Sequence, residues 1–315
     1  MVKFLIIGDL HGNKPKIHFK DFDAIIAPGD FCGDEIRKYF DGWGNAKKKD
    51  GKPYKSTTEY LNSNYSKKFL KKLENDSLKI GRNILKYLNS FGKPVFIIPG
   101  NWDDSYGKIN DSVKKISSEL INRHKMFSGK ETNKYLTKGL KNIVDCQFKL
   151  VNFRGYNLIG YGLNMVPELP SSDSNIMKVL NRKLRKKITK KDWKKVLESY
   201  NKLFNKIQNL YNKSDKKYPL IYLSHNMPYN TKFDRIKKPG HSVHNKHYGS
   251  MISRDFILKN SPLVCIGGHM HEYFGKIKLG KTIVVNSGFG SRVNVLLELE
   301  GKKIKTLKFY PKPYG

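Results

Sequence analysis

The chain has 315 residues, of which 61 are Lys or Arg and 27 are Asp or Glu, so its formal net charge is +34. No apolar run approaches the roughly 20 residues that a membrane-spanning helix needs, and the early polar residues do not fit a signal peptide. Three cysteines without close spacing offer no disulfide framework and fit a reducing, cytoplasmic setting.

Six short apolar runs, rich in residues that favour strands, predict a sheet structure in which the strands are buried on both faces. These runs span 3–7, 23–27, 94–98, 219–223, 262–266 and 281–285. Each is followed, directly or after one Pro, by Gly, Ser or Asn. Alternating apolar residues at 145–162 and 293–310 predict two hairpins, of which the second turns at residues 300–302.

Helical spacing of apolar residues falls between these strands, at 66–92, 110–124 and 189–211. The third helix carries an apolar stripe that is typical of core packing. The stripe consists of Trp193, Val196, Leu197, Tyr200, Phe204 and Ile207. We expect one domain over residues 1–315, with a polar loop and helix inserted at about 35–90 and a basic helical insertion at about 170–217.

The positive charge is densest at residues 178–195, which hold ten Lys or Arg against a single acidic residue, Asp192. Only nine of the 61 basic residues in the chain are Arg, whereas nucleic-acid surfaces usually favour Arg because guanidinium binds phosphate through two hydrogen bonds. Two interpretations stay open. The lysines form a solvated face or reflect a biased composition, or they attract an anionic substrate or nucleic acid.

Polar side chains of the types that bind metals follow five of the predicted strands. They are Asp9 and His11 in "GDLHG", Asp30 in "PGDFCG", Asn101 in "GNWD", His225 in "LSHN", and His269 and His271 in "GGHMHE". Oxygen and imidazole ligands suit borderline divalent ions such as manganese, iron, cobalt and zinc. Ligands two residues apart can diverge toward two different ions, and the neighbouring glycines allow sharp turns.

Taken together, these five motifs resemble those of the calcineurin-like metallophosphoesterase family, which are D-x-H, G-D, G-N-H-[DE], a lone H, and G-H-x-H in this order. The resemblance runs from residue 8 to 271. It implies an α/β fold of two packed mixed β-sheets flanked by helices, a four-layer α/β/β/α sandwich. It also implies that Asp9, His11 and His271 hold one metal ion, that Asn101, His225 and His269 hold a second, and that Asp30 bridges them.

The chemistry that the resemblance implies is hydrolysis of phosphate esters by a hydroxide that bridges two divalent ions about 3.5–4 Å apart. We expect manganese, with iron, zinc, cobalt or nickel as alternatives. Asp30 and Asn101 are then catalytic as well as ligating. Expected partners are a phosphate-ester small molecule or nucleotide, with nucleic acid as an option because of the charge, and no membrane.

One position departs from the family pattern, since Trp102 stands where the family has the His that is thought to protonate the leaving oxygen. An indole N–H can donate a hydrogen bond but cannot give up a proton at useful pH, so Asp103 loses its obvious partner. We therefore interpret Trp102 as a substrate-binding side chain. Esters with good leaving groups, such as diesters, suit a site that lacks this acid.

A replacement acid is offered by "GHSVHNKHYGS" at 240–250, which resembles an H-x-G-S segment in some branches of the family. His247 is the candidate for the acid or for a phosphate donor, and His241 and His244 are weaker candidates. The leading prediction is a binuclear metal-dependent phosphodiesterase. The alternatives are a nuclease with the same metal site and a non-catalytic metal-binding scaffold of the same fold.

Overall fold

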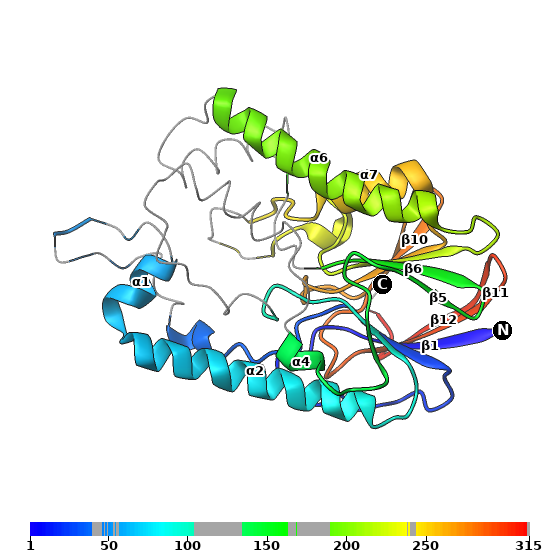
Figure 1. The fold of residues 1–315 in the computed structure, drawn as a ribbon, viewed down its shortest axis with the longest axis horizontal. Coiled ribbons are helices and arrows are strands. Elements are labelled where there is room, and N and C mark those ends of the chain that lie inside the picture. The colour runs from blue at the N-terminus through cyan, green and yellow to red at the C-terminus, as the bar shows by residue number, and fades with distance from the viewer. Residues whose placement is uncertain are drawn as a thin grey trace.

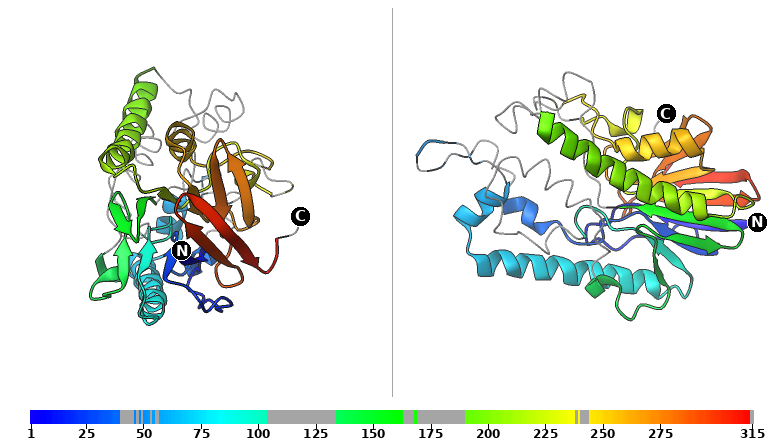
Figure 2. Two further views of the ribbon diagram at one scale, coloured as in Figure 1. Left: turned by 90° about the vertical axis from the view of Figure 1, so that its right-hand side faces the viewer. Right: turned by 45° about the horizontal axis from the view of Figure 1, so that its top comes forward.

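The computed structural model describes residues 1–39, 46, 48, 50–52, 54, 57–103, 134–162, 168, 190–237, 239 and 244–313. Two six-stranded sheets pack face to face, with α2 (Lys67–Asn89) outside one and α6 (Lys190–Lys213) and α7 (Met251–Asn260) outside the other (Figure 1). The two further views show the same order of layers (Figure 2). The predicted α/β/β/α sandwich is confirmed.

Each sheet contains four neighbouring strands that are parallel to one another. The first sheet has the order β12-β11-β1-β2-β3-β4, in which β1 to β4 are parallel and β11 and β12 form an antiparallel hairpin beside β1. Its strands are β1 (Val2–Ile7), β2 (Ala24–Ala27), β3 (Val95–Ile97), β4 (Ile143–Asp145), β11 (Asn294–Glu300) and β12 (Lys303–Tyr310).

The second sheet has the order β5-β6-β7-β8-β10-β9, with β6, β7, β8 and β10 parallel and an antiparallel strand at each edge. Its strands are β5 (Leu150–Phe153), β6 (Tyr156–Tyr161), β7 (Leu220–Ser224), β8 (Val264–Gly267), β9 (Gly275–Leu279) and β10 (Thr282–Asn286). The carboxyl ends of the parallel strands in both sheets lie on the same side of the molecule, which positions the site.

The six predicted strands, both hairpins and the helices at 66–92 and 189–211 are confirmed, whereas the helix predicted at 110–124 lies outside the described residues. The strands β4 and β9 and the helix α7 were not predicted. Small elements complete the described fold: η1 (Glu35–Tyr39), α1 (Thr57–Asn64), α4 (Lys134–Thr137) and η2 (Lys232–Asp234).

The strands are almost continuously apolar because both of their faces are buried. In β1, Phe4 and Ile6 belong to the core between the two sheets, while Leu5 and Ile7 belong to the core beneath α2. Burying one such side chain contributes about 1.5–3 kcal/mol relative to leaving it exposed. This double burial explains why the strands lack the apolar–polar alternation of a sheet with one wet face.

The stripe on α6 forms part of the core over the second sheet, with one exception. Tyr200, Leu203 and Ile207 are buried there and Val196 is buried beside them, whereas Leu197 is 39% exposed. The prediction for Leu197 is wrong because its position falls at the edge of the apolar stripe. The side chain of Trp193 lies outside the described residues. Among the described helices, none combines the length and apolarity that crossing a bilayer requires.

Candidate metal centre

The structure brings all seven predicted ligands to one place. They follow the carboxyl ends of parallel strands from both sheets: Asp9 and His11 after β1, Asp30 after β2, Asn101 after β3, His225 after β7, and His269 and His271 after β8. Parallel strands end at the same edge of a sheet, and the two sheets face each other. Side chains that are up to 262 residues apart in the sequence therefore meet.

The first group of ligand atoms comes from Asp9, His11, Asp30 and His271, and these atoms all lie within 4.8 Å of one another. The Nε2 atoms of His11 and His271 are 3.1 Å apart. Nε2 of His271 lies 2.8 Å from Oδ2 of Asp9, and Nε2 of His11 lies 3.6 Å from Oδ2 of Asp30. Four ligand atoms of this kind match the coordination of one borderline divalent ion.

The second group comes from Asp30, His225 and His269, again within 4.8 Å. Nε2 of His225 lies 3.4 Å from Oδ2 of Asp30. One end of the Asn101 amide lies 2.9 Å from Nε2 of His225, 2.9 Å from Nδ1 of His269 and 3.3 Å from Oδ2 of Asp30. Asp30 is therefore the carboxylate that the two groups share.

Several polar atoms in these groups are better placed to bind a cation than to hydrogen-bond to one another. Oδ1 of Asp9 is buried without a hydrogen-bond partner in the described structure. Nδ1 of His225 lies 2.9 Å from the carbonyl oxygen of Pro28, which can only accept, so this nitrogen carries the proton and Nε2 is directed at the group. A metal centre requires buried oxygen and nitrogen atoms that face one point and can share their lone pairs with a cation. Oδ1 of Asp9 and Nε2 of His225 are placed in this way, so the residues fit divalent ions.

The electrostatics of the metal-free protein point the same way. Burial opposes a charge on His225, but the carboxylates of Asp30 and Asp9 outweigh it and raise the pKa of His225 to about 9. Burial also opposes a charge on Asp30, yet His225 and His11 hold its pKa well below the usual range. Burial and the neighbouring His225 lower the pKa of His269 to about 3. A protonated His225 thus supplies the positive charge that ions supply when bound.

The backbone is strained where it carries these ligands. His11, Asp30 and His269 have φ angles of 44°, 53° and 65°, a left-handed conformation that costs non-glycine residues on the order of 1–3 kcal/mol. Two glycines allow the loops to approach closely, since a Cβ on Gly100 would lie 2.1 Å from Oδ1 of Asp30 and one on Gly268 would lie 2.3 Å from Oδ1 of Asp9. Such concentrated strain is typical of functional sites.

The carboxylate of Asp103 accepts hydrogen bonds from backbone N–H groups, which the sequence did not reveal. It is fully buried, and its Oδ1 accepts hydrogen bonds from the backbone nitrogens of Phe31 at 2.8 Å and Cys32 at 3.0 Å. Its Oδ2 accepts from the backbone nitrogen of Gly100 at 2.8 Å. In place of the His that the sequence lacks, Asp103 has backbone partners, so its carboxylate ties the loop after β2 to the loop after β3.

Trp102 lies between this site and a small aromatic cluster around η1, α1 and the start of α2. Its ring is 6.1 Å from the ring of His11, edge to face, and Nε1 is 3.1 Å from the second end of the Asn101 amide. Its backbone nitrogen donates to Oδ1 of Asp30 at 2.8 Å. Trp102 thus contacts predicted ligands of both groups as well as the neighbouring aromatic cluster.

His247 lies outside the group of seven but is held in a defined position. Nδ1 is 2.7 Å from Oδ1 of the buried Asp234, and Nε2 accepts from Nε of Arg235 at 3.3 Å. Among the described residues no hydrogen bond, ion pair or ring contact joins His247 to the seven. Its loop is tied to their surroundings, since Asn226 donates to the carbonyl of Tyr248 at 2.9 Å. His241 lies outside the described residues, and His244 is half-buried in the same loop.

Sequence reasoning missed Arg37, which stands at the edge of the first group. Its Nη1 pairs with Oδ2 of Asp34 at 3.2 Å, and its guanidinium lies 5.3 Å from the centre of the Trp102 ring. The same Asp34 oxygen is 4.0 Å from Nδ1 of His11. The only signal in the sequence is an Arg shortly after Asp30 in a chain that otherwise prefers Lys.

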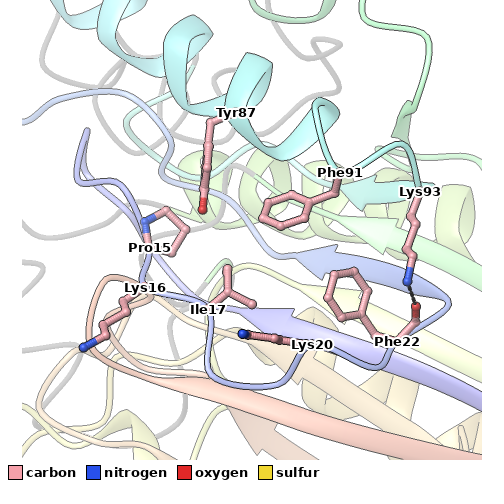
Figure 3. A pocket seen from close by; sticks show the side chains of 8 residues that line it. All are labelled: Pro15, Lys16, Ile17, Lys20, Phe22, Tyr87, Phe91 and Lys93. Atoms are coloured by element: carbon pink, nitrogen blue, oxygen red, sulfur yellow. Dashed lines mark hydrogen bonds between the residues drawn. The ribbon is translucent and has the colours of Figure 1, made fainter.

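A separate pocket of about 540 Å³ lies between the loop after β1 and the end of α2, away from all seven ligands (Figure 3). Its rings and lysines line a surface groove, and Lys93 donates to the carbonyl oxygen of Phe22. It is lined by Pro15, Lys16, Ile17, Lys20, Phe22, Tyr87, Phe91 and Lys93. None of these residues was predicted to act in the chemistry.

Comparison with known proteins agrees with this geometry. A profile of the family described as calcineurin-like phosphoesterase matches residues 2–273. No curated protein matches the chain. One solved structure is similar at 17% identity, with a TM-score of 0.52, over 97% of this chain and 98% of its own, and this likeness shows the fold alone.

Two further solved structures are similar at lower scores. The protein TT1561 of Thermus thermophilus is 15% identical over 96% of this chain and 97% of its own, with a TM-score of 0.44. Phosphopantetheinyl hydrolase from Mycobacterium tuberculosis is 10% identical over 91% of this chain and 89% of its own, with a TM-score of 0.43.

Proposed function

The chain belongs to the calcineurin-like phosphoesterase family, and from that premise we propose that it hydrolyses phosphate esters, preferably diesters, at a centre of two divalent metal ions. Residues 1–315 would form one such domain, with insertions at about 35–90 and 170–217. Asp9, His11 and His271 would hold the first ion, Asn101, His225 and His269 the second, and Asp30 both.

One observation carries the proposal: Asp30 is shared by the two groups of ligand atoms, each of which lies within 4.8 Å. A carboxylate has two oxygens and can serve two cations at once, whereas a single ion would leave one group of buried acceptors unsatisfied. The ligand set of imidazole, carboxylate and amide suits manganese, iron, cobalt, nickel or zinc, and we favour manganese.

When bound, such ions neutralise charge on phosphoryl oxygens and make hydroxide available near neutral pH. The side chains of this protein then have three tasks. Trp102 would set the shape of the substrate side, beside the aromatic cluster. Arg37 would hold a phosphoryl oxygen, and His247, oriented by Asp234 through the 2.7 Å contact, would deliver a proton to the leaving oxygen.

The experiment that tests this function is a hydrolysis screen with the metal-depleted chain, resupplied with each ion in turn. Its substrates are aryl and alkyl monoesters and diesters, cyclic nucleotides and oligonucleotides. We expect turnover to require added metal and to be highest on diesters. Failure to hydrolyse any ester after reconstitution with two ions would favour the scaffold of the same fold instead.

Arg37 provides a prediction within this proposal. Replacing Arg37 by Ala should lower kcat/KM for phosphate esters roughly 10- to 100-fold and weaken inhibition by inorganic phosphate, because a charge-assisted contact to the phosphoryl group is lost. Arg37→Lys should recover part of the loss. The matched control is Arg154→Ala, which removes a surface guanidinium paired with Asp23. Unchanged phosphate inhibition in Arg37→Ala would remove Arg37 from the site.

The nuclease alternative is favoured by one observation, the net charge of +34. If the basic segment serves a polyanion, oligonucleotide binding should weaken steeply with salt, and reversing four of its lysines to Glu should flatten that dependence. The reversed set is Lys186, Lys187, Lys190 and Lys191, and the control set is Lys302, Lys303, Lys305 and Lys308. Equal salt slopes for both sets would argue against a nucleic-acid track at 178–195.

A further inference from the structure

The groove beside the end of α2 brings aromatic rings and lysines together (Figure 3). Tyr87 and Phe91, both half-buried, form one wall and contact each other edge to face, with their ring centres 5.2 Å apart. Phe22 is buried at one end, where its ring centre lies 6.0 Å from that of Phe91. Pro15 and Ile17 form the opposite wall. The volume of about 540 Å³ falls within the usual range of small-ligand sites, so a flat ring fits between the walls.

The groove is basic from one end to the other. None of the residues that line it is acidic, and three of them are lysines. Lys16 and Lys20 are exposed, and within the described residues neither ammonium group forms an ion pair or a hydrogen bond. Lys93 lies at the buried end of the groove, and Lys14, beside the groove, has its ammonium group 4.3 Å from the centre of the Tyr87 ring. Positive charge at both ends suits an extended anion.

The acidic side chains that adjoin the groove in the sequence do not cancel this charge. Asp21 pairs with the ammonium group of Lys3. Asp23 accepts hydrogen bonds from the guanidinium of Arg154 at 2.5 Å and from the backbone nitrogen of Lys3 at 2.8 Å. The last carbonyl groups of α2 also have a partner, since the backbone nitrogen of Ser90 donates to them. The groove therefore presents free ammonium groups, while these neighbouring acceptors are engaged elsewhere.

From this combination we infer that the groove binds single-stranded nucleic acid, with one base between its two walls and phosphates on Lys14, Lys16 and Lys20. Sites of this kind join a basic track to rings on which bases stack, because every base has an aromatic face. A duplex keeps those faces inside its own stack, and a free nucleotide has too few phosphates to reach lysines at both ends. The groove lies away from all seven predicted ligands, so this binding goes beyond ester hydrolysis and needs no metal ion.

Fluorescence anisotropy with the full chain and a labelled single-stranded oligonucleotide tests the inference, with a chelator present so that no strand is cleaved. Tyr87→Leu keeps an apolar side chain in the wall but removes the ring, and it should weaken binding roughly 5-fold or more. The control Tyr218→Leu makes the same change at a ring that is 44% exposed and outside the groove, and it should leave the affinity unchanged. Equal affinities for Tyr87→Leu and the parent chain would overturn the inference.

A strand without bases separates stacking from charge. An abasic oligonucleotide of the same length keeps every phosphate, so Tyr87→Leu should change its affinity by less than about twofold. The intact strand should lose its full 5-fold or more in the same variant. Equal losses on the two strands would contradict the stacking of a base on Tyr87.

The phosphate contacts are tested by Lys16→Gln combined with Lys20→Gln. Each phosphate contact to a single strand contributes about −0.7 to the slope of log affinity against log salt concentration, so this slope should become shallower by about 1.4. The control, Lys302→Gln combined with Lys303→Gln, removes the same charge at the turn between β11 and β12 and should leave the slope unchanged. Because both double variants have the same net charge, equal slopes for the two would overturn the groove as the track.

Competition and crosslinking on the unchanged chain identify the occupant. The duplex, a free mononucleotide and an acidic peptide should each displace the labelled strand at least 10-fold less well than the unlabelled strand does, and equal displacement by any of them would overturn the single strand as ligand. A strand that carries a photoreactive base should crosslink to Tyr87 or Phe91, and adducts confined to other residues would sink the inference. A chain that binds the strand through the groove but hydrolyses no ester would contradict only the proposed function.

Discussion

Replacing Asp30 by Ala should cost the protein both of its metal ions and reduce ester hydrolysis roughly 10³-fold or more, as removal of a member of a concerted catalytic unit does. The reason is that Asp30 is the carboxylate common to both groups. Its loss also removes one of the two buried carboxylates, Asp30 and Asp9, that act on His225 and His11. Metal content is measured by elemental analysis after reconstitution with Mn²⁺, and activity on an aryl diester.

Thermal melts sharpen this test. Ions that bind only the folded chain raise its Tm by mass action, so a chelator should lower the Tm of the parent protein and leave that of Asp30→Ala nearly unchanged. The control is Asp34→Asn, which removes a carboxylate 4.0 Å from Nδ1 of His11 but outside the two groups, and which should still hold two ions. Two ions in Asp30→Ala would contradict the bridging role.

Replacing His247 by Ala should slow hydrolysis of an alkyl ester by roughly 10²-fold or more and leave hydrolysis of an aryl diester nearly unchanged. An aryl oxide leaves without a proton, whereas an alkoxide needs one, and the site has Trp102 where the family has its acid. The contact between His247 and the buried Asp234 at 2.7 Å fixes the ring for this role. The measurement is kcat/KM for both esters in each protein.

Two companion variants separate proton delivery from structure. His247→Gln can still hydrogen-bond to Asp234 but cannot transfer a proton, so it should be as slow as His247→Ala on the alkyl ester. His18→Ala removes an imidazole that stacks on Tyr310 and should slow neither ester. If His247→Ala slows both esters equally, His247 holds phosphate or structure and is no acid.

Much of the fold could be predicted because its signals are local. Each core strand is a continuous apolar run, since both faces are buried, and each run stops at Gly, Pro or a polar residue. The helices at 66–92 and 189–211 repeat apolar residues at helical spacing. The helix α7 escaped prediction because its ten residues carry apolar side chains on several faces, so that Ile252 and Phe256 are buried while Leu258 is 46% exposed.

The seven candidate ligands could be selected from the sequence, because five motifs in a fixed order are far more specific than any single His or Asp. The sequence could not show the partners that these residues acquire across the fold. It showed that Asp103 loses the His beside it, but not that Asp103 accepts three backbone hydrogen bonds instead. Nothing in the sequence pairs Asp234 with His247 or places Arg37 beside Trp102.

The sequence by itself therefore determined the core strands, though not β4 and β9, and the side chains that stand at their ends, since both follow from burial and from the local chemistry of turns. Only the tertiary structure decided which of these side chains share an ion site and which partners hold them. The order of strands in the two sheets places Asp30 between His11 and His225. The physical reason is that hydrogen bonds and charge interactions act over a few ångströms in space, and the distances along the chain do not encode them.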